Sequence, residues 1–201
     1  PLPPILISSS STEIKLKSYL YISQNNGGLP LKFKYFCDIC SINNIETEDA
    51  NEVVTFIVLP GNVYKIYLSI QNIIGSANSD LISILSASKP DKIQKPQISI
   101  LDGNVILTFN NPNSNGSPII EYRIIFYKNP NTPISIYYSK NYSPSYTFSM
   151  NSLRESQKFL TNDKVFVSVS ALNIKGNSDE SELSSDIIFV SDKPLTPTLS
   201  P

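Results

Sequence analysis

The chain repeats itself at a spacing of about one hundred residues, and this repeat constrains its fold more than any other feature. Residues 64–76 (YKIYLSIQNIIGS) match residues 165–177 (VFVSVSALNIKGN) in their alternation of side chains and in their closing Asn and Gly. Upstream, residues 28–31 (GLPL) match residues 116–119 (GSPI). Because a repeat of this length corresponds to a whole small domain, we predict two domains of one kind.

The predicted boundary lies in the joint at residues 89–96 (KPDKIQKP). This joint is short, contains two Pro and has no Gly, which favours a semi-rigid connection over a flexible one. We predict a first module over residues 1–90, a second over residues 91–193, and a linker or the start of a further module over residues 194–201.

Short runs within each copy alternate apolar and polar side chains, as β-strands with one buried face do. Residues 13–17 (EIKLK) show this alternation most clearly, and Asn-Gly pairs at residues 26–27 and 115–116 mark turns. No stretch longer than about ten residues keeps the period of a helix. Several short strands in each copy predict an all-β fold of two sandwiches.

The order of these motifs resembles tandem fibronectin type III modules over nearly the whole chain. The resemblance is carried by residues 96–124 and 167–178 in the second copy, and by residues 26–31, 59–64 and 72–75 in the first. It implies that each module is an immunoglobulin-like β-sandwich of about seven strands. Immunoglobulin domains proper match less well, because the chain has no Trp for their Cys…Trp…Cys framework.

The resemblance also assigns core positions. Tyr64 stands where the family has a corner tyrosine that bonds back to the backbone, whereas the second copy has Val165 there and should lack that bond. Phe109 takes the place of the family's buried Trp, and Tyr19 or Tyr21 is the candidate in the first copy. The expected fold-defining core residues are Tyr64, Phe109, Tyr122, Leu59 and Leu160.

Composition argues against several kinds of chemistry. The chain has no His, and its formal net charge is −1. Without His, Ser-His-Asp and Cys-His nucleophile arrangements cannot form, and nearly every zinc site is lost. A near-neutral chain attracts neither nucleic acid nor an anionic membrane. We therefore expect no catalytic residues, no metal, no cofactor, no nucleic-acid partner and no membrane insertion, and we do not expect an enzyme.

Cys37 and Cys40 are the only cysteines, and they have a CxxC spacing. In an extended strand, residues three apart point to opposite faces and lie too far apart to bridge. Cys37 aligns with Phe126 of the second copy, and Cys40 falls near the following turn, where a local disulfide becomes feasible. The pattern favours free thiols, with a local disulfide as the alternative.

Two sequons, at Asn115 and Asn141, are the predicted N-glycosylation acceptors, and both are expected to be exposed in loops of a secreted protein. The acidic residues at 46–52 and 179–182 are interpreted as solvated loops. Tyr137 and Tyr138 are interpreted as a half-buried sandwich surface, with an aromatic contact surface as the alternative.

These patterns predict a non-enzymatic structural or adhesive segment of a large multi-module protein. It would act as a spacer and a protein–protein interaction scaffold, at the cell surface or in an extracellular filament. Its partners would be other protein modules, neighbouring repeats or copies of itself, bound through loops or strand edges. The alternatives are an intracellular cytoskeletal or ciliary scaffold, an accessory module pair of a secreted enzyme, and a receptor ectodomain.

Overall fold

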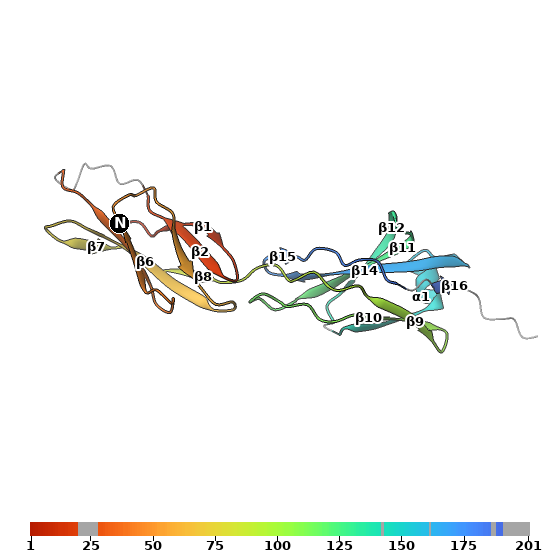
Figure 1. Cartoon of the computed structure of the whole chain (residues 1–201). Helices are drawn as coiled ribbons and strands as arrows, with labels where there is room; N and C mark the ends of the chain where they lie inside the picture. The colour runs from red at the N-terminus through yellow and green to blue at the C-terminus, as the bar shows by residue number, and fades with distance from the viewer. Residues whose placement is uncertain (20–27, 142, 161, 186–187, 191–201) are drawn as a thin grey trace, which may run out of the picture. The chain divides into compact units, whose positions relative to one another are not determined.

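The computed structural model describes residues 1–19, 28–141, 143–160, 162–185 and 188–190. Apart from one six-residue helix, all of their helices and strands are β-strands, which confirms the predicted all-β fold. The chain divides into two compact units, each with two facing layers of strands (Figure 1). Unit 1 comprises Pro1–Ser88 and Asn115–Ser117, and unit 2 comprises Lys89–Ser114 and the described residues from Pro118 onward.

Unit 1 has one sheet of three strands and one of five, all antiparallel. The smaller sheet has the order β1-β2-β5, with strands at Ile5–Ser9, Glu13–Lys17 and Val54–Ile57. The larger sheet has the order β4-β3-β6-β7, with β8 also paired to β6. Its strands are β3 (Lys32–Cys37), β4 (Asn44–Thr47), β6 (Val63–Gln71), β7 (Ser76–Asn78) and β8 (Ile82–Leu85).

Unit 2 repeats this arrangement. Its three-stranded sheet has the order β13-β10-β9, with strands at Ser145–Ser149, Asn104–Thr108 and Gln97–Leu101. Its larger sheet has the order β12-β11-β14-β15, with β16 also paired to β14. The strands of that sheet are β11 (Glu121–Asn129), β12 (Thr132–Ser139), β14 (Asp163–Asn173), β15 (Gly176–Asn177) and β16 (Ile188–Val190). In each unit, two short strands therefore pair with the same long strand: β7 and β8 with β6, and β15 and β16 with β14.

Each unit buries its own hydrophobic core between its two sheets. In β2, for example, Ile14 and Leu16 are fully buried while Lys15 and Lys17 lie at the surface, as the alternation predicted. Burial of one such side chain contributes about 1.5–3 kcal/mol. The repeated alternation therefore stabilises each sandwich from within.

Tyr64, Phe109 and Tyr122 are buried, but Leu59 and Leu160 are not core residues. The side chains of Leu59 and Leu160 are 69% and 68% exposed, so that part of the prediction was wrong. In each unit the preceding residue, Val58 or Phe159, is the one that points into the core. Leu59 and Leu160 contribute to the fold through hydrogen bonds of their backbone N–H groups.

The second strand of each unit carries a different residue at the position assigned to the family's Trp. Ile14 pairs with Phe56 and Val105 pairs with Phe148, so the matching positions four residues later are Ser18 and Phe109. Ser18 is buried, and its hydroxyl shares its one hydrogen between the carbonyls of Tyr19 and Ala50, at 3.0 and 2.9 Å. Neither aromatic candidate is supported, because Tyr19 is exposed and Tyr21 lies outside the described residues.

A short helix, α1 (Met150–Glu155), lies between β13 and β14 and was not predicted. Ser149 caps it, because its Oγ accepts a hydrogen bond from the Ser152 N–H at 3.1 Å. Leu153 is fully buried and joins the core of unit 2. Six residues make fewer than two turns, which is too short for a helical period to show in the sequence.

Candidate interaction surfaces

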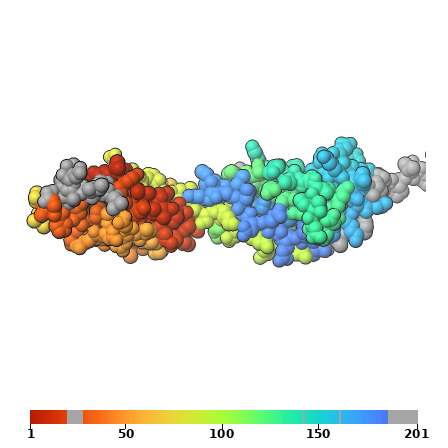
Figure 2. Space-filling model, turned by 90° about the horizontal axis from the view of Figure 1, so that it is seen from above, coloured from red at the N-terminus to blue at the C-terminus, as the bar shows by residue number. Residues whose placement is uncertain are grey.

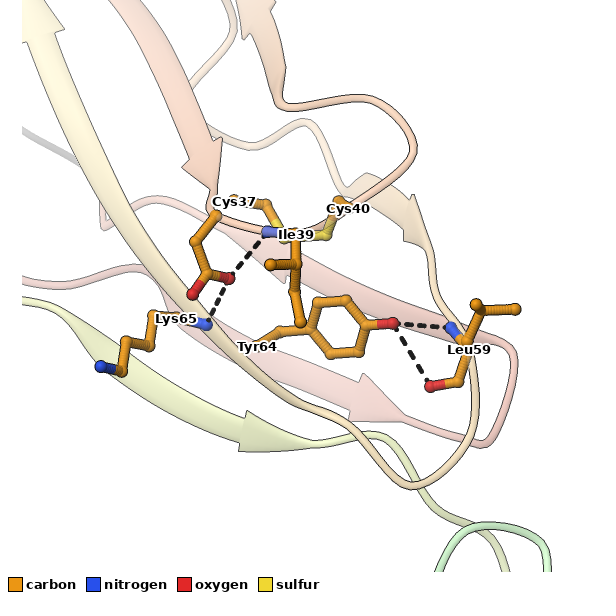
Figure 3. Close-up of a disulfide and its surroundings, with 7 residues drawn as sticks. Cys37, Ile39, Cys40, Leu59, Tyr64 and Lys65 are labelled. Atoms are coloured by element: carbon orange, nitrogen blue, oxygen red, sulfur yellow. Dashed lines mark hydrogen bonds between the residues drawn. A yellow bond between two sulfur atoms is a disulfide. The ribbon is translucent and has the colours of Figure 1, made fainter.

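A disulfide between Cys37 and Cys40 closes the turn that follows β3 (Figure 3). The chain turns directly after Cys37 and brings the two Cα atoms to 5.5 Å, within the range that a disulfide requires. Both cysteines are buried, and the turn leaves Ile39 exposed. The structure therefore contains the local disulfide, whereas the CxxC spacing had favoured free thiols. The disulfide can form because the chain is not extended over these four residues.

Asp38 holds this turn against the neighbouring strand. Its Oδ1 accepts hydrogen bonds from the backbone N–H groups of Ile39 at 2.9 Å and Lys65 at 3.0 Å (Figure 3). The Asp38 N–H in turn donates to the carbonyl of Lys65 at 3.2 Å. The Cys37 N–H also donates to the Asn43 carbonyl at 2.8 Å, so the disulfide and four hydrogen bonds hold this loop.

Tyr64 forms the predicted corner in unit 1. Its hydroxyl accepts a hydrogen bond from the Leu59 N–H at 2.7 Å and donates to the Leu59 carbonyl at 3.3 Å (Figure 3). Leu59 therefore contributes its backbone to the fold while its side chain stays in solvent.

Unit 2 has a carboxylate where unit 1 has the corner hydroxyl. Asp163 Oδ2 accepts a hydrogen bond from the Leu160 N–H at 2.7 Å and forms an ion pair with Lys128 Nζ at 2.6 Å. The hydrogen bond from Lys128 and that from Leu160 lower the pKa of Asp163 below its ordinary value. The second copy was correctly expected to lack the tyrosine bond, but a substitute two residues before Val165 was not foreseen.

The hairpin tips of the two units expose apolar side chains. At the β6–β7 tip, Ile73 and Ile74 are 89% and 82% exposed, and Asn72 Oδ1 accepts hydrogen bonds from the N–H groups of Ile74 and Gly75. Ile174 at the β14–β15 tip is also exposed. Both tips therefore present isoleucine side chains to solvent.

A ladder of three serines runs beside β14 and was missed by the sequence analysis. Each serine makes two hydrogen bonds with one residue of β14: its N–H donates to the carbonyl of that residue, and its hydroxyl accepts a hydrogen bond from the N–H of the same residue. The three serines are Ser178, Ser181 and Ser184. The partner residues in β14 are Ala171, Val169 and Val167. The serines recur every three residues between charged positions, which is the signal that could have found them.

The acidic segments have local partners. Glu46 and Glu48 form ion pairs with Lys32, whose pKa is raised chiefly by the hydrogen bond to Glu46. Asp179 pairs with Lys89 at 2.7 Å, and this hydrogen bond lowers the pKa of Asp179. These exposed pairs contribute little to stability. Within the described part of the chain, no group of three or more His, Cys, Asp or Glu residues is placed to hold a metal ion.

The two sequons lie in different surroundings. Asn141, between β12 and β13, is exposed. Asn115, between β10 and β11, is only partly exposed, in a turn with a φ of 52°, and Ser117 of its sequon is buried. The expectation that both acceptors are exposed therefore holds for Asn141 and is met only in part at Asn115.

Strand β12 forms one edge of the large sheet of unit 2 and carries the predicted tyrosine surface. Tyr137 packs edge-to-face on Phe148, with ring centroids 5.5 Å apart, and is still 38% exposed, whereas Tyr138 is 57% exposed. Tyr146 is buried, which raises its pKa, and its hydroxyl donates to the Asn141 carbonyl. Neighbouring tyrosines thus divide between the core and the surface, so both interpretations hold for part of the set.

No described helix is both long and apolar enough to pass through a lipid bilayer.

Comparisons with known proteins identify the fold. No family model matches the sequence, and no curated protein matches it. Among solved structures, the chain is similar to a crystal structure of titin domains, with a TM-score of 0.53 and 14% identity, covering 94% of this chain and 66% of that one. A structure of the FN1–FN3 domains of chicken CNTN1 matches with a TM-score of 0.43 and 12% identity, covering 96% of this chain and 67% of that one.

The architecture and the titin match show the fold of this chain, two immunoglobulin-like β-sandwiches on one chain, which is the fold that the resemblance to fibronectin type III modules implied. The chain spans less than two thirds of the length of the titin structure that it matches.

Proposed function

We propose that this chain is a non-enzymatic structural and adhesive segment of a larger multi-module protein. It serves as a spacer and as a scaffold for protein–protein contacts. The observation that carries the proposal is that each of the two sandwich units contains its own buried core within one continuous chain. Units that are stabilised separately bear load one at a time, which suits a spacer.

The surfaces support contact rather than chemistry. The exposed isoleucines of the hairpin tips and the fixed Cys37–Cys40 turn offer apolar, pre-organised contact points. The net charge of −1 gives little electrostatic steering, so shape and hydrogen bonding would select the partner.

We place the segment outside the cell, at the cell surface or in an extracellular filament. The Cys37–Cys40 disulfide supports this location, because disulfides persist in oxidising compartments. Asn141, in an exposed loop, is the preferred glycan acceptor.

Single-molecule pulling on the whole chain tests the spacer role. We expect two separate unfolding events, each releasing roughly 300 Å of extended chain, because each unit has about ninety residues at about 3.5 Å per residue. One combined event, or extension without a force peak, would contradict independent load-bearing units.

Peptide mapping of protein from its native source, without reduction, tests the location. We expect a Cys37–Cys40 disulfide and a hexose-containing mass on the Asn141 peptide. Reduced cysteines together with an unmodified Asn141 would instead support the intracellular scaffold.

A further inference from the structure

Strand β12 is an edge with an unpaired outer side. It pairs with β11 through a regular register from Tyr122↔Ser139 to Phe126↔Ser135, and no other described strand pairs with it. All eight residues of β12 (TPISIYYS) are uncharged. Pro133 has no N–H, but over the regular segment Ser135–Ser139 the outer side of β12 presents backbone N–H and C=O groups to any strand that fits beside it. In Figure 2, β12 lies on the face of unit 2 that is turned to the viewer.

The other edge strands of the described chain are shorter than β12, and some carry a charge or an irregular register. Strands β5 and β13 are uncharged edges of four and five residues. The corresponding strand of unit 1, β4, has four residues and carries Glu46. Strand β1 has an irregular register between Leu6 and Ser8, and β7 and β15 have three and two residues. Strand β9 is five residues long and contacts β16. Charge, bulges and short length all discourage edge pairing. Strand β12, with eight residues, is the longest of these edges, and its register is regular over Ser135–Ser139.

The inner side chains of β12 hold this strand in place. Tyr137 packs on Phe148, and the Ser135 hydroxyl donates to Gln157 Oε1 at 2.7 Å. On the opposite face, Ile136 and Tyr138 are 38% and 57% exposed. An incoming strand would thus meet a backbone that is already ordered, which lowers the entropic cost of pairing.

We propose that β12 pairs antiparallel with β12 of a second copy of this chain, about a two-fold axis at Tyr137. This inference deepens the proposed scaffold function by naming the partner and the surface. The symmetry sets Ile136 opposite Tyr138 of the copy, and Ser135 opposite Ser139. An isologous interface requires a surface complementary to itself, and a charged strand would set like charges close together. β12 meets this requirement because it has no charge and because its apolar and aromatic residues fall opposite each other.

The interface is small. One strand edge belongs to the class of contacts that bury less than about 1,200 Å² in total, so we expect a weak dimer that forms only at high concentration.

Sedimentation velocity of the whole chain, from micromolar to millimolar concentration, tests the dimer. We expect a concentration-dependent shift from monomer to dimer that the variant Ile136→Lys/Tyr138→Lys abolishes. The matched control is Ile100→Lys/Leu101→Lys, two exposed apolar residues on β9 of the same unit, which should dimerise like the parent chain. Far-UV circular dichroism and thermal melting establish that both variants are folded.

A crosslinking experiment tests the register. When an Ile136→Cys variant is mixed with a Tyr138→Cys variant and oxidised, an intermolecular disulfide should form. Either variant alone should crosslink much less, because the proposed axis sets its two new thiols diagonally and too far apart to bridge.

A chain that stays monomeric at all concentrations would overturn the proposal and would favour an extended strand of another protein as the occupant. Dimerisation that survives the β12 substitutions, or that the β9 substitutions abolish, would also overturn it. Two unfolding events in the pulling experiment would leave the spacer role standing in either case.

Discussion

Unit 1 and unit 2 close the same position of the same fold by different means. Cys37 pairs with Ile66 and Phe126 pairs with Val167, so the two residues occupy equivalent positions in the large sheets. In unit 1 the strand stops there, and a disulfide turns the chain. In unit 2, β11 continues to Asn129. The difference shows that a local covalent bond and a packed aromatic cluster are interchangeable solutions at this position.

The aromatic cluster of unit 2 has three phenylalanines. The Phe126 ring packs edge-to-face on Phe148 at 5.1 Å and on Phe159 at 6.1 Å between centroids. Its counterpart in unit 1 is a small cystine, with Phe56 and Val58 nearby in the core. Unit 1 therefore depends on its redox state, and unit 2 depends on apolar burial.

The largest expected effect is that of Phe126→Ala. Loss of a fully buried Phe side chain should lower the free energy of unfolding of unit 2 by about 3–5 kcal/mol, because a cavity remains. Hydrogen exchange with mass spectrometry should show loss of protection in β11, β13 and β14, with β3 and β6 unchanged. The exposed Ile174→Ala is the control. Equal losses in both units would show that their cores are not independent.

Removal of the disulfide should have the next largest effect. In the loop-closure picture, bridging four residues contributes about 2 kcal/mol, so Cys37→Ser/Cys40→Ser should destabilise unit 1 by about that amount. Denaturant unfolding with and without a reductant measures it. The parent chain should respond to the reductant and the double variant should not. If the unfolding midpoint of unit 2, which has no cysteine, also shifted, the stabilities of the two units would not be independent.

The corner of unit 1 offers a smaller test. Tyr64→Phe removes the hydroxyl that bonds Leu59 and should lower the free energy of unfolding of unit 1 by about 1 kcal/mol. Tyr67→Phe, in the same strand, is the matched control. Urea unfolding provides the comparison, and equal stability of the two variants would show that the corner bonds contribute nothing.

The corner of unit 2 should respond to pH, with the smallest effect. Because the folded pKa of Asp163 is lowered, its contribution is present above the unfolded value of about 3.9 and is lost as pH falls through the folded pKa. The partly exposed ion pair limits the change to at most about 1 kcal/mol. Asp163→Asn should flatten the acid dependence of unit 2 unfolding, whereas Glu182→Gln should leave it unchanged. An unaltered profile in Asp163→Asn would show that this carboxylate is not involved.

Much of the fold followed from local patterns, and most of the candidate surfaces did not. The alternation in residues 13–17 predicted which side chains of β2 are buried, because a strand has a period of two. The sequence pattern wrongly predicted a buried side chain at Leu59, because this residue contributes its backbone N–H, which donates to the Tyr64 hydroxyl. The alternation also did not predict the role of Ser178, whose hydroxyl accepts a hydrogen bond from the Ala171 N–H. Here a side chain bonds the strand in place of a backbone group, and such a segment has no alternation of apolar and polar residues.

The amino-acid sequence was enough to predict two β-sandwiches in tandem. A repeated order of short alternating segments is a property of neighbouring residues and needs no knowledge of distances. Only the folded units show that Cys37 bonds to Cys40 and that Asp163 in unit 2 binds the backbone as Tyr64 does in unit 1. Only they show that none of the described strands pairs with the outer side of β12. Each of these depends on which backbone groups come within bonding distance after the strands have paired, and that is set by the packing of the whole unit.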